Sequence, residues 1–269
     1  MRVVSIIATS ILVVGLAACG RGGGPSDLNL PSTPTTAPVL TPRTAANVGS
    51  VASSSAPSPI PLPAVSLVAR VRVARLAVYD SPAATHPVRE LTNPWLAVAH
   101  VPSVHVPQVF LVDAQQHGWV EVLLPVRPNG SDGWVRASDV MIDTVPYAIR
   151  VVLHARTMTV FNHGNPLWEG AVAVGAPATP TPTGRYYIRM LLTATKPTTV
   201  FGPYAFGLSS SSGAITSFAG SDGEIAIHGN DDPSSLGLAA TLGSIRIPNA
   251  EITKLAAVLP LGTPVDIEP

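Results

Sequence analysis

Two stretches near the end of the chain decide the fold: Ile225-Ala226-Ile227-His228-Gly229-Asn230 and Thr241-Leu242-Gly243-Ser244-Ile245-Arg246-Ile247-Pro248-Asn249. The first completes an apolar run over 224–228 that predicts a strand with a histidine at its end. The second leads into the best helix candidate of the chain, at 250–259. An apolar stripe at helical spacing and Asn249 as a plausible N-cap support that helix.

The surrounding region, 146–269, predicts a mainly β fold with this single helix. Only 12% of the residues are charged, whereas Val, Ala, Thr and Pro are abundant, which favours short strands with many turns over long charged helices. Further strands are expected at 147–154, 157–161, 167–174, 186–192 and 261–267, with a hairpin turn at 162–166.

A smaller β unit is predicted at 65–145. Short β-branched and aromatic runs recur there, and Asn-Gly at 129–130 is a strong turn signal. Gly118-Trp119 and Gly133-Trp134 lie on either side of that turn. This pattern resembles a small bacterial SH3-like barrel, in which Trp119 and Trp134 are core or groove-wall residues.

The N-terminus has the features of an export signal. Met1-Arg2 is followed by an apolar run over 3–16 that is shorter than the roughly 20 residues of a spanning helix and ends in small residues. Leu16-Ala17-Ala18-Cys19 resembles a bacterial lipobox. It predicts a signal peptide at 1–19 and lipid on Cys19, so the protein would be exported, anchored on the outer face of the cytoplasmic membrane and facing the cell wall. The alternative is an ordinary signal peptide with an incidental cysteine.

Residues 20–64 predict a tether between this anchor and the β units. The segment holds nine prolines among Ser, Thr, Ala and Gly, and it shows no apolar periodicity. Such a composition buries too little surface to offset the entropy of ordering. Proline keeps the chain extended, at about 3.1 Å per residue at most.

Charge and cysteine content exclude several classes of function. The net charge is zero, which argues against a nucleic-acid partner. Cys19 is the only cysteine, so an intrachain disulfide is impossible and a cysteine-ligated zinc site is not expected. No nucleotide or phosphate-binding fingerprint is present, and we expect neither a cofactor nor a metal. The oligomeric state is left open.

Three segments, in order, resemble the L,D-transpeptidase catalytic domain over nearly all of 146–269. They are Thr181-Pro182-Thr183-Gly184-Arg185-Tyr186-Tyr187-Ile188, the Ile227-His228-Gly229 strand end, and Gly243-Ser244-Ile245-Arg246 with Asn249 and the following helix. The resemblance implies a β-sandwich with one helix, preceded here by the SH3-like unit. It also implies peptidoglycan stem peptides as partners and acyl transfer that cross-links two stems.

The resemblance also implies roles for individual residues. In the family, a cysteine thiolate attacks the stem-peptide carbonyl, D-alanine leaves, and carbapenems acylate the same cysteine. Carried over, His228 is the base, Gly229 supplies the carbonyl that orients it, Ser244 occupies the nucleophile position, and Gly243 lets the backbone approach the substrate. Arg246 braces the loop or meets a substrate carboxylate, and Asn249 and Tyr204 belong to the substrate side.

The pattern departs from the family at the nucleophile, where Ser244 replaces the cysteine, and at Leu242, where the family has histidine. A cysteine with a pKa near 8.5 is readily deprotonated by a neighbouring histidine, whereas serine must lose its proton during attack. Three alternatives follow: a serine-dependent transpeptidase, a non-catalytic module that binds peptidoglycan, and a hydrolase. Any carbapenem adduct should be an ester on Ser244.

Overall fold

The computed structural model describes residues 13–14, 62–97, 105–194, 201–214, 223–230 and 232–269. Residues 62–269 belong to one compact unit, whereas the second unit, Ala17–Pro61, lies outside the described residues. Cys19 and the tether therefore stay predictions. In the part of the chain that is described, no helix is both long and apolar enough to cross a membrane.

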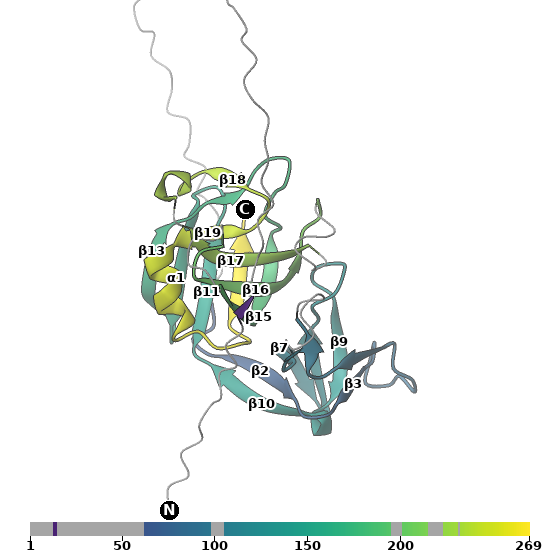
Figure 1. The fold of residues 1–269 in the computed structure, drawn as a ribbon. Helices are drawn as coiled ribbons and strands as arrows, with labels where there is room; N and C mark the ends of the chain where they lie inside the picture. Colours follow the sequence, from purple (N-terminus) through teal and green to yellow (C-terminus); the bar gives the residue numbers. More distant parts are fainter. Residues whose placement is uncertain (1–12, 15–61, 98–104, 195–200, 215–222, 231) are drawn as a thin grey trace, which may run out of the picture. The chain divides into compact units, whose positions relative to one another are not determined.

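A nine-stranded sheet dominates the C-terminal half (Figure 1). Its main path runs β13–β12–β11–β20–β15–β16–β17–β19, and β1 (Val13–Val14) pairs with β15 off that path. The bounds along the path are β13 Asn165–Ala171, β12 Thr157–Asn162, β11 Tyr147–Val152, β20 Pro264–Glu268, β15 Gly184–Ala194, β16 Tyr204–Ser211, β17 Glu224–Asn230 and β19 Ile245–Pro248.

β15 connects the two halves of this sheet, because it is long enough to pair with a strand of each half. Its first part, Gly184–Tyr187, pairs with β20, and its later part pairs with β16. Alternating apolar side chains from the two halves form one buried cluster, as expected for strands with one face toward a core. Members of that cluster are Val151 and Val160 from one half and Leu208, Ile225 and Ile227 from the other.

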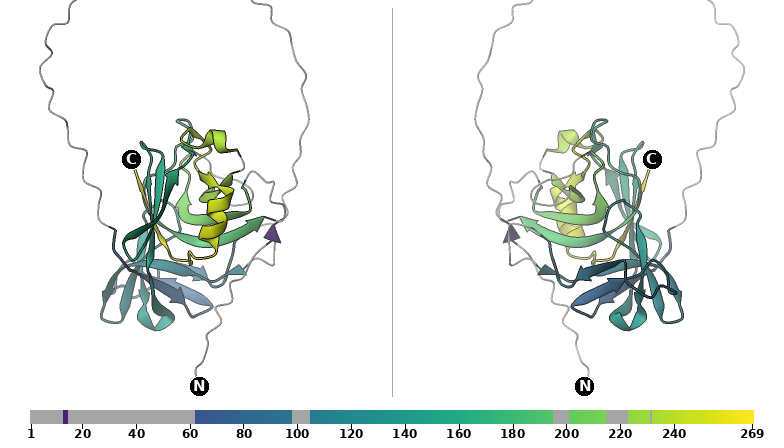
Figure 2. Two further views of the ribbon diagram at one scale, coloured as in Figure 1. Left: turned by 90° about the vertical axis from the view of Figure 1, so that its left-hand side faces the viewer. Right: turned by 90° about the vertical axis from the view of Figure 1, so that its right-hand side faces the viewer.

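The single α-helix among the described residues, α1 (Asn249–Ala256), packs against β16 and β17 (Figure 2). Ile252 and Leu255 are buried, so the predicted apolar stripe is confirmed. The predicted bounds were wrong. The helix begins one residue earlier and ends at Ala256, before the predicted end at 259, and Pro248 occupies the N-cap position without a side-chain cap bond. Asn249 cannot serve as the cap, because its side-chain oxygen lies against the backbone of Gly202 and Gly229.

The N-terminal part is a five-stranded sheet with the order β10–β2–β7–β8–β9. Its likeness to an SH3-like barrel stays a prediction. The strands are β2 Ser66–Val71, β7 Val109–Gln116, β8 Trp119–Leu123, β9 Asp132–Arg136 and β10 Val140–Val145. Three two-stranded pairs and two short 3-10 helices complete the described elements: β3 Arg75–Val78 with β4 Arg89–Thr92, β5 Trp95–Leu96 with β6 His105–Val106, β14 Val174–Gly175 with β18 Ala239–Thr241, η1 Ala137–Asp139 and η2 Pro233–Ser235.

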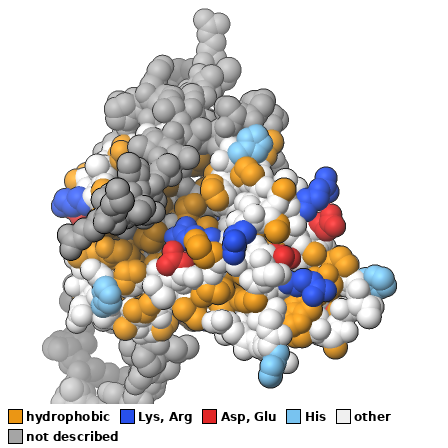
Figure 3. Space-filling model, turned by 90° about the horizontal axis from the view of Figure 1, so that it is seen from below, with side chains coloured by type: hydrophobic (Ala, Val, Ile, Leu, Met, Phe, Trp, Pro, Cys, Tyr) orange, Lys and Arg blue, Asp and Glu red, His pale blue; other side chains and the backbone are white. Residues whose placement is uncertain are grey.

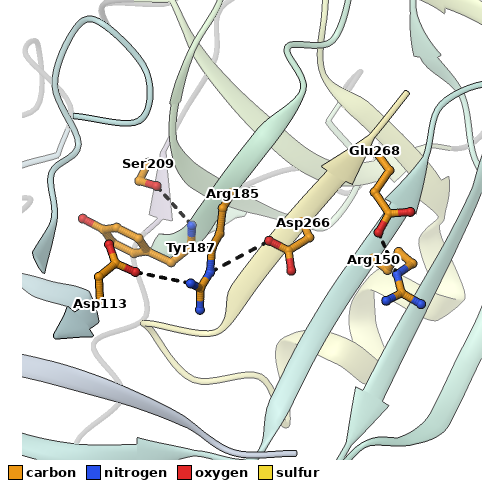
Figure 4. A network of polar contacts seen from close by, with 7 residues as sticks. All are labelled: Asp113, Arg150, Arg185, Tyr187, Ser209, Asp266 and Glu268. Carbon is orange, nitrogen blue, oxygen red and sulfur yellow. Dashed lines mark hydrogen bonds and ion pairs between the residues drawn. The ribbon is translucent and has the colours of Figure 1, made fainter. Parts of the chain in front are cut away.

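Side chains cross the predicted boundary at 145/146. Tyr187 of β15 is fully buried in the apolar cluster of the N-terminal sheet, where its ring meets Phe110 edge to face at 6.5 Å. Figure 4 shows Arg185 between Asp113 of β7, at 3.3 Å, and Asp266 of β20, at 4.0 Å. The two β units therefore share core and polar contacts.

The surface matches the low charge content. The face drawn in Figure 3, on the side where β2 and β10 lie in Figure 1, shows broad hydrophobic areas between a few basic and acidic side chains. Leu67 of β2 and Met141 and Ile142 of β10 are exposed. Exposed apolar side chains are ordinary on protein surfaces, so they assign no function by themselves.

Candidate active site

His228 is held in a buried position by β17. This strand pairs in parallel with β19, and His228 stands in register with Arg246. Only 3% of the His228 residue surface is exposed. Its Nδ1 lies 2.7 Å from the carbonyl oxygen of Gly229, and its ring meets the Phe201 ring edge to face at 5.1 Å. Because a carbonyl only accepts, Nδ1 carries the proton and Nε2 keeps a free lone pair.

The surroundings keep this imidazole neutral. Burial lowers the pKa of His228 to about 4; the hydrogen bond to Gly229 opposes that shift and the positive charge of Arg246 adds to it. A neutral ring is the form that accepts a proton, so His228 is ready as a base throughout the neutral range. The same low pKa makes it a weak base.

The buried histidine should make stability depend on pH. Between its ordinary pKa of 6.5 and its folded pKa of about 4, the unfolded chain binds a proton at His228 that the folded chain does not. Its contribution is therefore fully present above pH 6.5 and is lost as pH falls toward 4, by about 3 kcal/mol. Urea unfolding at several pH values should show this loss in the wild type and not in His228→Gln. Parallel pH curves for the two proteins would contradict the shift.

Ser244 lies in a loop that is fixed by hydrogen bonds to its backbone. Gly243 has a φ of +111°, a conformation that favours glycine, and brings the chain into the turn. Thr241 Oγ1 donates to Ser244 O at 2.6 Å and accepts from Gly243 N at 3.1 Å. Thr181 Oγ1 donates to Gly243 O at 2.8 Å and accepts from Gly175 N at 2.8 Å. None of these bonds uses the Ser244 side chain.

Ser244 and His228 line one cavity. The cavity has a volume of about 180 Å³ and is lined by Phe201, Ser212, Gly223, Glu224, Ile225, His228, Thr241, Leu242, Ser244 and Arg246. Ser244 Oγ accepts a hydrogen bond from Ala226 N at 3.3 Å. Among the described residues, no hydrogen bond joins Ser244 Oγ to the His228 ring. Catalytic hydrogen bonds are often long without substrate, so the two groups still form a base and a nucleophile candidate.

Two arginines give the cavity its charge pattern. Glu224 lies on the wall and forms a half-buried ion pair with Arg189, at 2.5 Å. Arg246 lies on the same wall, and its Nε is buried with no hydrogen-bond partner among the described residues. Glu224 and Arg246 therefore place one acidic and one basic side chain on the wall, and the guanidinium of Arg246 suits a ligand carboxylate.

The other predicted residues fall around the cavity and not on its wall. Asn249 lies beside Gly229, whose carbonyl orients His228, because a Cβ added to Gly229 would lie 2.2 Å from Asn249 Oδ1. Tyr204 begins β16 and packs against the main core. Asp232 caps η2 by accepting from Ser234 N and is exposed, so it does not orient His228. Asp231 lies outside the described residues.

The sequence did not single out the residues that support the Ser244 loop. Thr181 was noticed only as part of a motif, and Thr241 had no assigned role, although both threonines are buried and bind loop backbone. Phe201 and Glu224 were also missed. A threonine two residues before a glycine is too common a pattern to signal such a bond. Where the chain is described, no group of three His, Cys, Asp or Glu side chains could hold a metal ion.

Removal of one of these supports should cost stability. Thr181→Val leaves Gly175 N–H and Gly243 O without their partner in a buried place, which should lower the free energy of unfolding by about 1–3 kcal/mol. Urea unfolding of Thr253→Val serves as the control, because Thr253 is exposed on α1. Equal losses in the two variants would mean that the Thr181 bonds are not needed.

A neutral histidine with an oriented ring and a hydroxyl in one cavity is the chemistry of acyl transfer through a nucleophile and a general base. The family model for the YkuD L,D-transpeptidase catalytic domain matches residues 146–267. The chain is 32% identical over 156 residues to a YkuD protein of Bacillus licheniformis, named as an L,D-transpeptidase, covering 55% of this chain and 86% of the relative. The chain is 31% identical to the Bacillus subtilis counterpart, and the match covers 54% of this chain and 84% of that protein. The chain therefore belongs to the L,D-transpeptidase family, whose members transfer acyl groups to cross-link peptidoglycan.

Solved structures include a cysteine-to-serine mutant of the Enterococcus faecium L,D-transpeptidase. It is 24% identical, with a TM-score of 0.35, and the match covers 45% of this chain and 48% of that one. The chain thus spans about half of that protein's length.

Proposed function

We propose that the protein binds peptidoglycan stem peptides in the cavity shared by His228 and Ser244, and that acyl transfer through Ser244 is slow. The observation that supports this proposal is that an oriented, neutral histidine and a serine on a braced loop line one cavity. In this reaction the Ser244 Oγ–C bond forms as the hydroxyl proton passes to His228 Nε2. The proton then goes to the departing amine of D-alanine, and an acyl ester stays on Ser244.

Slow transfer is expected from the base and the nucleophile together. A serine hydroxyl gives up its proton only during attack, and a base with a pKa of about 4 offers little driving force for that transfer. Efficient serine enzymes orient their histidine with a carboxylate, whereas His228 has only the neutral carbonyl of Gly229. The alternative is a scaffold that binds stems without turnover. The lack of a His228–Ser244 hydrogen bond among the described residues favours it.

Arg246 is the candidate ligand-binding residue of the cavity. Its guanidinium group would bind the carboxylate of a stem peptide, a charge-assisted bond worth about 1.5–3 kcal/mol, because Arg246 lines the cavity. Arg246→Gln should therefore weaken tetrapeptide-stem binding by roughly tenfold or more in a calorimetric titration. Arg89→Gln, on an exposed arginine of β4, is the matched control. Equal affinities in both variants would leave Arg246 as a brace only.

The test of the function combines binding and turnover. Purified protein is titrated with disaccharide-tetrapeptides, and products are followed by mass spectrometry beside an active transpeptidase. Binding with slow release of D-alanine and dimers supports the proposal, and binding without product supports the scaffold. Tripeptide stems without dimers would indicate hydrolysis. A flat titration and no product would overturn all three.

The N-terminal segment is proposed to carry the protein to the cell envelope. The Leu16-Ala17-Ala18-Cys19 lipobox pattern supports export and a lipid anchor on the outer face of the cytoplasmic membrane, which would place the site near the cell wall. Cys19→Ser should shift the protein from the membrane fraction to the soluble fraction in cells. Membrane association that survives this change would contradict the anchor.

A further inference from the structure

A turn of the N-terminal β unit contacts the catalytic sheet at the end of β16. Asn129 Nδ2 donates to Ser211 O at 2.9 Å, and Ser211 N donates to Asn129 Oδ1 at 2.9 Å. Arg127 Nη1 donates to Ser212 O at 3.0 Å. The Asn129 amide thus gives Ser211 the two bonds that a neighbouring strand would supply, 82 residues away in sequence.

The residues held by this turn form one wall of the cavity. Ser212 lines the cavity, and its N–H donates to Gly223 O at 2.8 Å. Ser211 is paired with Glu224 between β16 and β17. Gly223 and Glu224 line the same cavity. The turn therefore holds Ser211 and Ser212 at the end of β16. Through these two residues it is linked to the start of β17.

A second contact from the N-terminal unit reaches the same wall. Arg189 of β15 stacks on the Trp95 ring of β5, with its guanidinium carbon 3.7 Å from the ring centroid. The same guanidinium is paired through Nη1 with Glu224 Oε1 at 2.5 Å. Stacking orients a planar guanidinium and so fixes the carboxylate it binds.

Strand ends open more readily than strand centres, so the order of the end of β16 and the start of β17 depends on the contacts that hold them. We propose that Asn129 is a positioning residue of the cavity, so that the N-terminal unit is a structural part of the ligand site and not a separate binding module. The choice of a stem peptide as the ligand rests on the proposed function. The positioning role itself rests on the contacts of Asn129 alone.

The experiment compares the full-length wild type, Asn129→Ala, Asn129→Asp and Asn165→Ala. Asn165 is the control because it begins β13, at the sheet edge opposite β19, where its amide makes a local bond to His163 O. Hydrogen exchange is measured at Ser212 N–H, whose acceptor is Gly223 and not Asn129. Exchange in β12 reports whether each variant is folded, and affinity for a disaccharide-tetrapeptide is measured in parallel.

We expect about tenfold faster exchange at Ser212 and about tenfold weaker stem binding in Asn129→Ala, because the two hydrogen bonds to Ser211 and a longer one to the Tyr186 hydroxyl, at 3.4 Å, are lost. Asn129→Asp, which still accepts from Ser211 N, should lie between Asn129→Ala and the wild type. Asn165→Ala should match the wild type. If the wild type binds no stem peptide, the proposed function fails and exchange alone decides the positioning role. Unchanged exchange at Ser212 in a folded Asn129→Ala overturns that role.

Discussion

Ser244→Cys should make the protein reactive toward a carbapenem, with an adduct at residue 244 forming on the order of 10²–10⁴ times faster than in the wild type. A thiol has a pKa near 8.5, so a few per cent is already thiolate at neutral pH. The Ser244 loop is fixed by Thr241 and Thr181 through backbone atoms, so the change of one side-chain atom should leave it in place. Intact-mass spectrometry over time measures the rate.

His228 should account for part of this gain. A thiolate is an anion, and it would raise the pKa of a histidine that now lies at about 4, giving an ion pair that serine cannot form. Adding His228→Gln to Ser244→Cys should remove most of the increase. Ser212→Cys is the matched control, because it places a thiol on the wall of the same cavity outside the loop. Equal reaction at positions 212 and 244 would show that the loop confers no special reactivity.

The sequence singled out two residues that line one cavity, His228 and Ser244, but not the residues that support them. The two motif stretches place His228 and Ser244 on one cavity, because parallel pairing of β17 with β19 brings together segments that are close in the chain. The apolar stripe of α1 was likewise predicted from the local spacing of apolar residues. Asn249 was assigned to the N-cap and to substrate, since the local pattern cannot show that Gly202 and Gly229 leave room for its amide.

Contacts between segments far apart in the chain could not be predicted from local sequence patterns. Tyr187 lies in a motif of the catalytic region, yet its ring packs in the core of the N-terminal sheet. Asn129 was predicted only as a turn residue, and its bonds to Ser211 depend on how two sheets meet. The low pKa of His228 also depends on burial that no motif specifies. Local periodicity fixes elements, whereas tertiary packing fixes partners and electrostatics.

Gly175→Ala should destabilise the protein by about 3 kcal/mol and disturb the Ser244 loop at the same time. A Cβ at this position would stand 2.3 Å from Thr179 O and 2.4 Å from Thr181 N, both backbone atoms that cannot rotate away. Forced overpacking of this kind costs about 1–3 kcal/mol and occasionally more. Urea unfolding measures the loss.

The substitution at Gly175 should also displace the Ser244 loop, because hydrogen bonds connect the two. Gly175 N donates to Thr181 Oγ1, and that hydroxyl donates to Gly243 O, next to Ser244. In the Ser244→Cys background, Gly175→Ala should therefore slow carbapenem acylation by about tenfold, the effect of roughly 1.4 kcal/mol at the site. Gly213→Ala is the matched control: no atom lies within 4 Å of its added methyl group, and its φ is not left-handed. That control should change stability by less than about 1 kcal/mol, with a small gain from reduced chain entropy. A Gly175→Ala protein with wild-type stability would mean that the turn at 179–181 relaxes freely, and the loop would then be held by Thr241 alone.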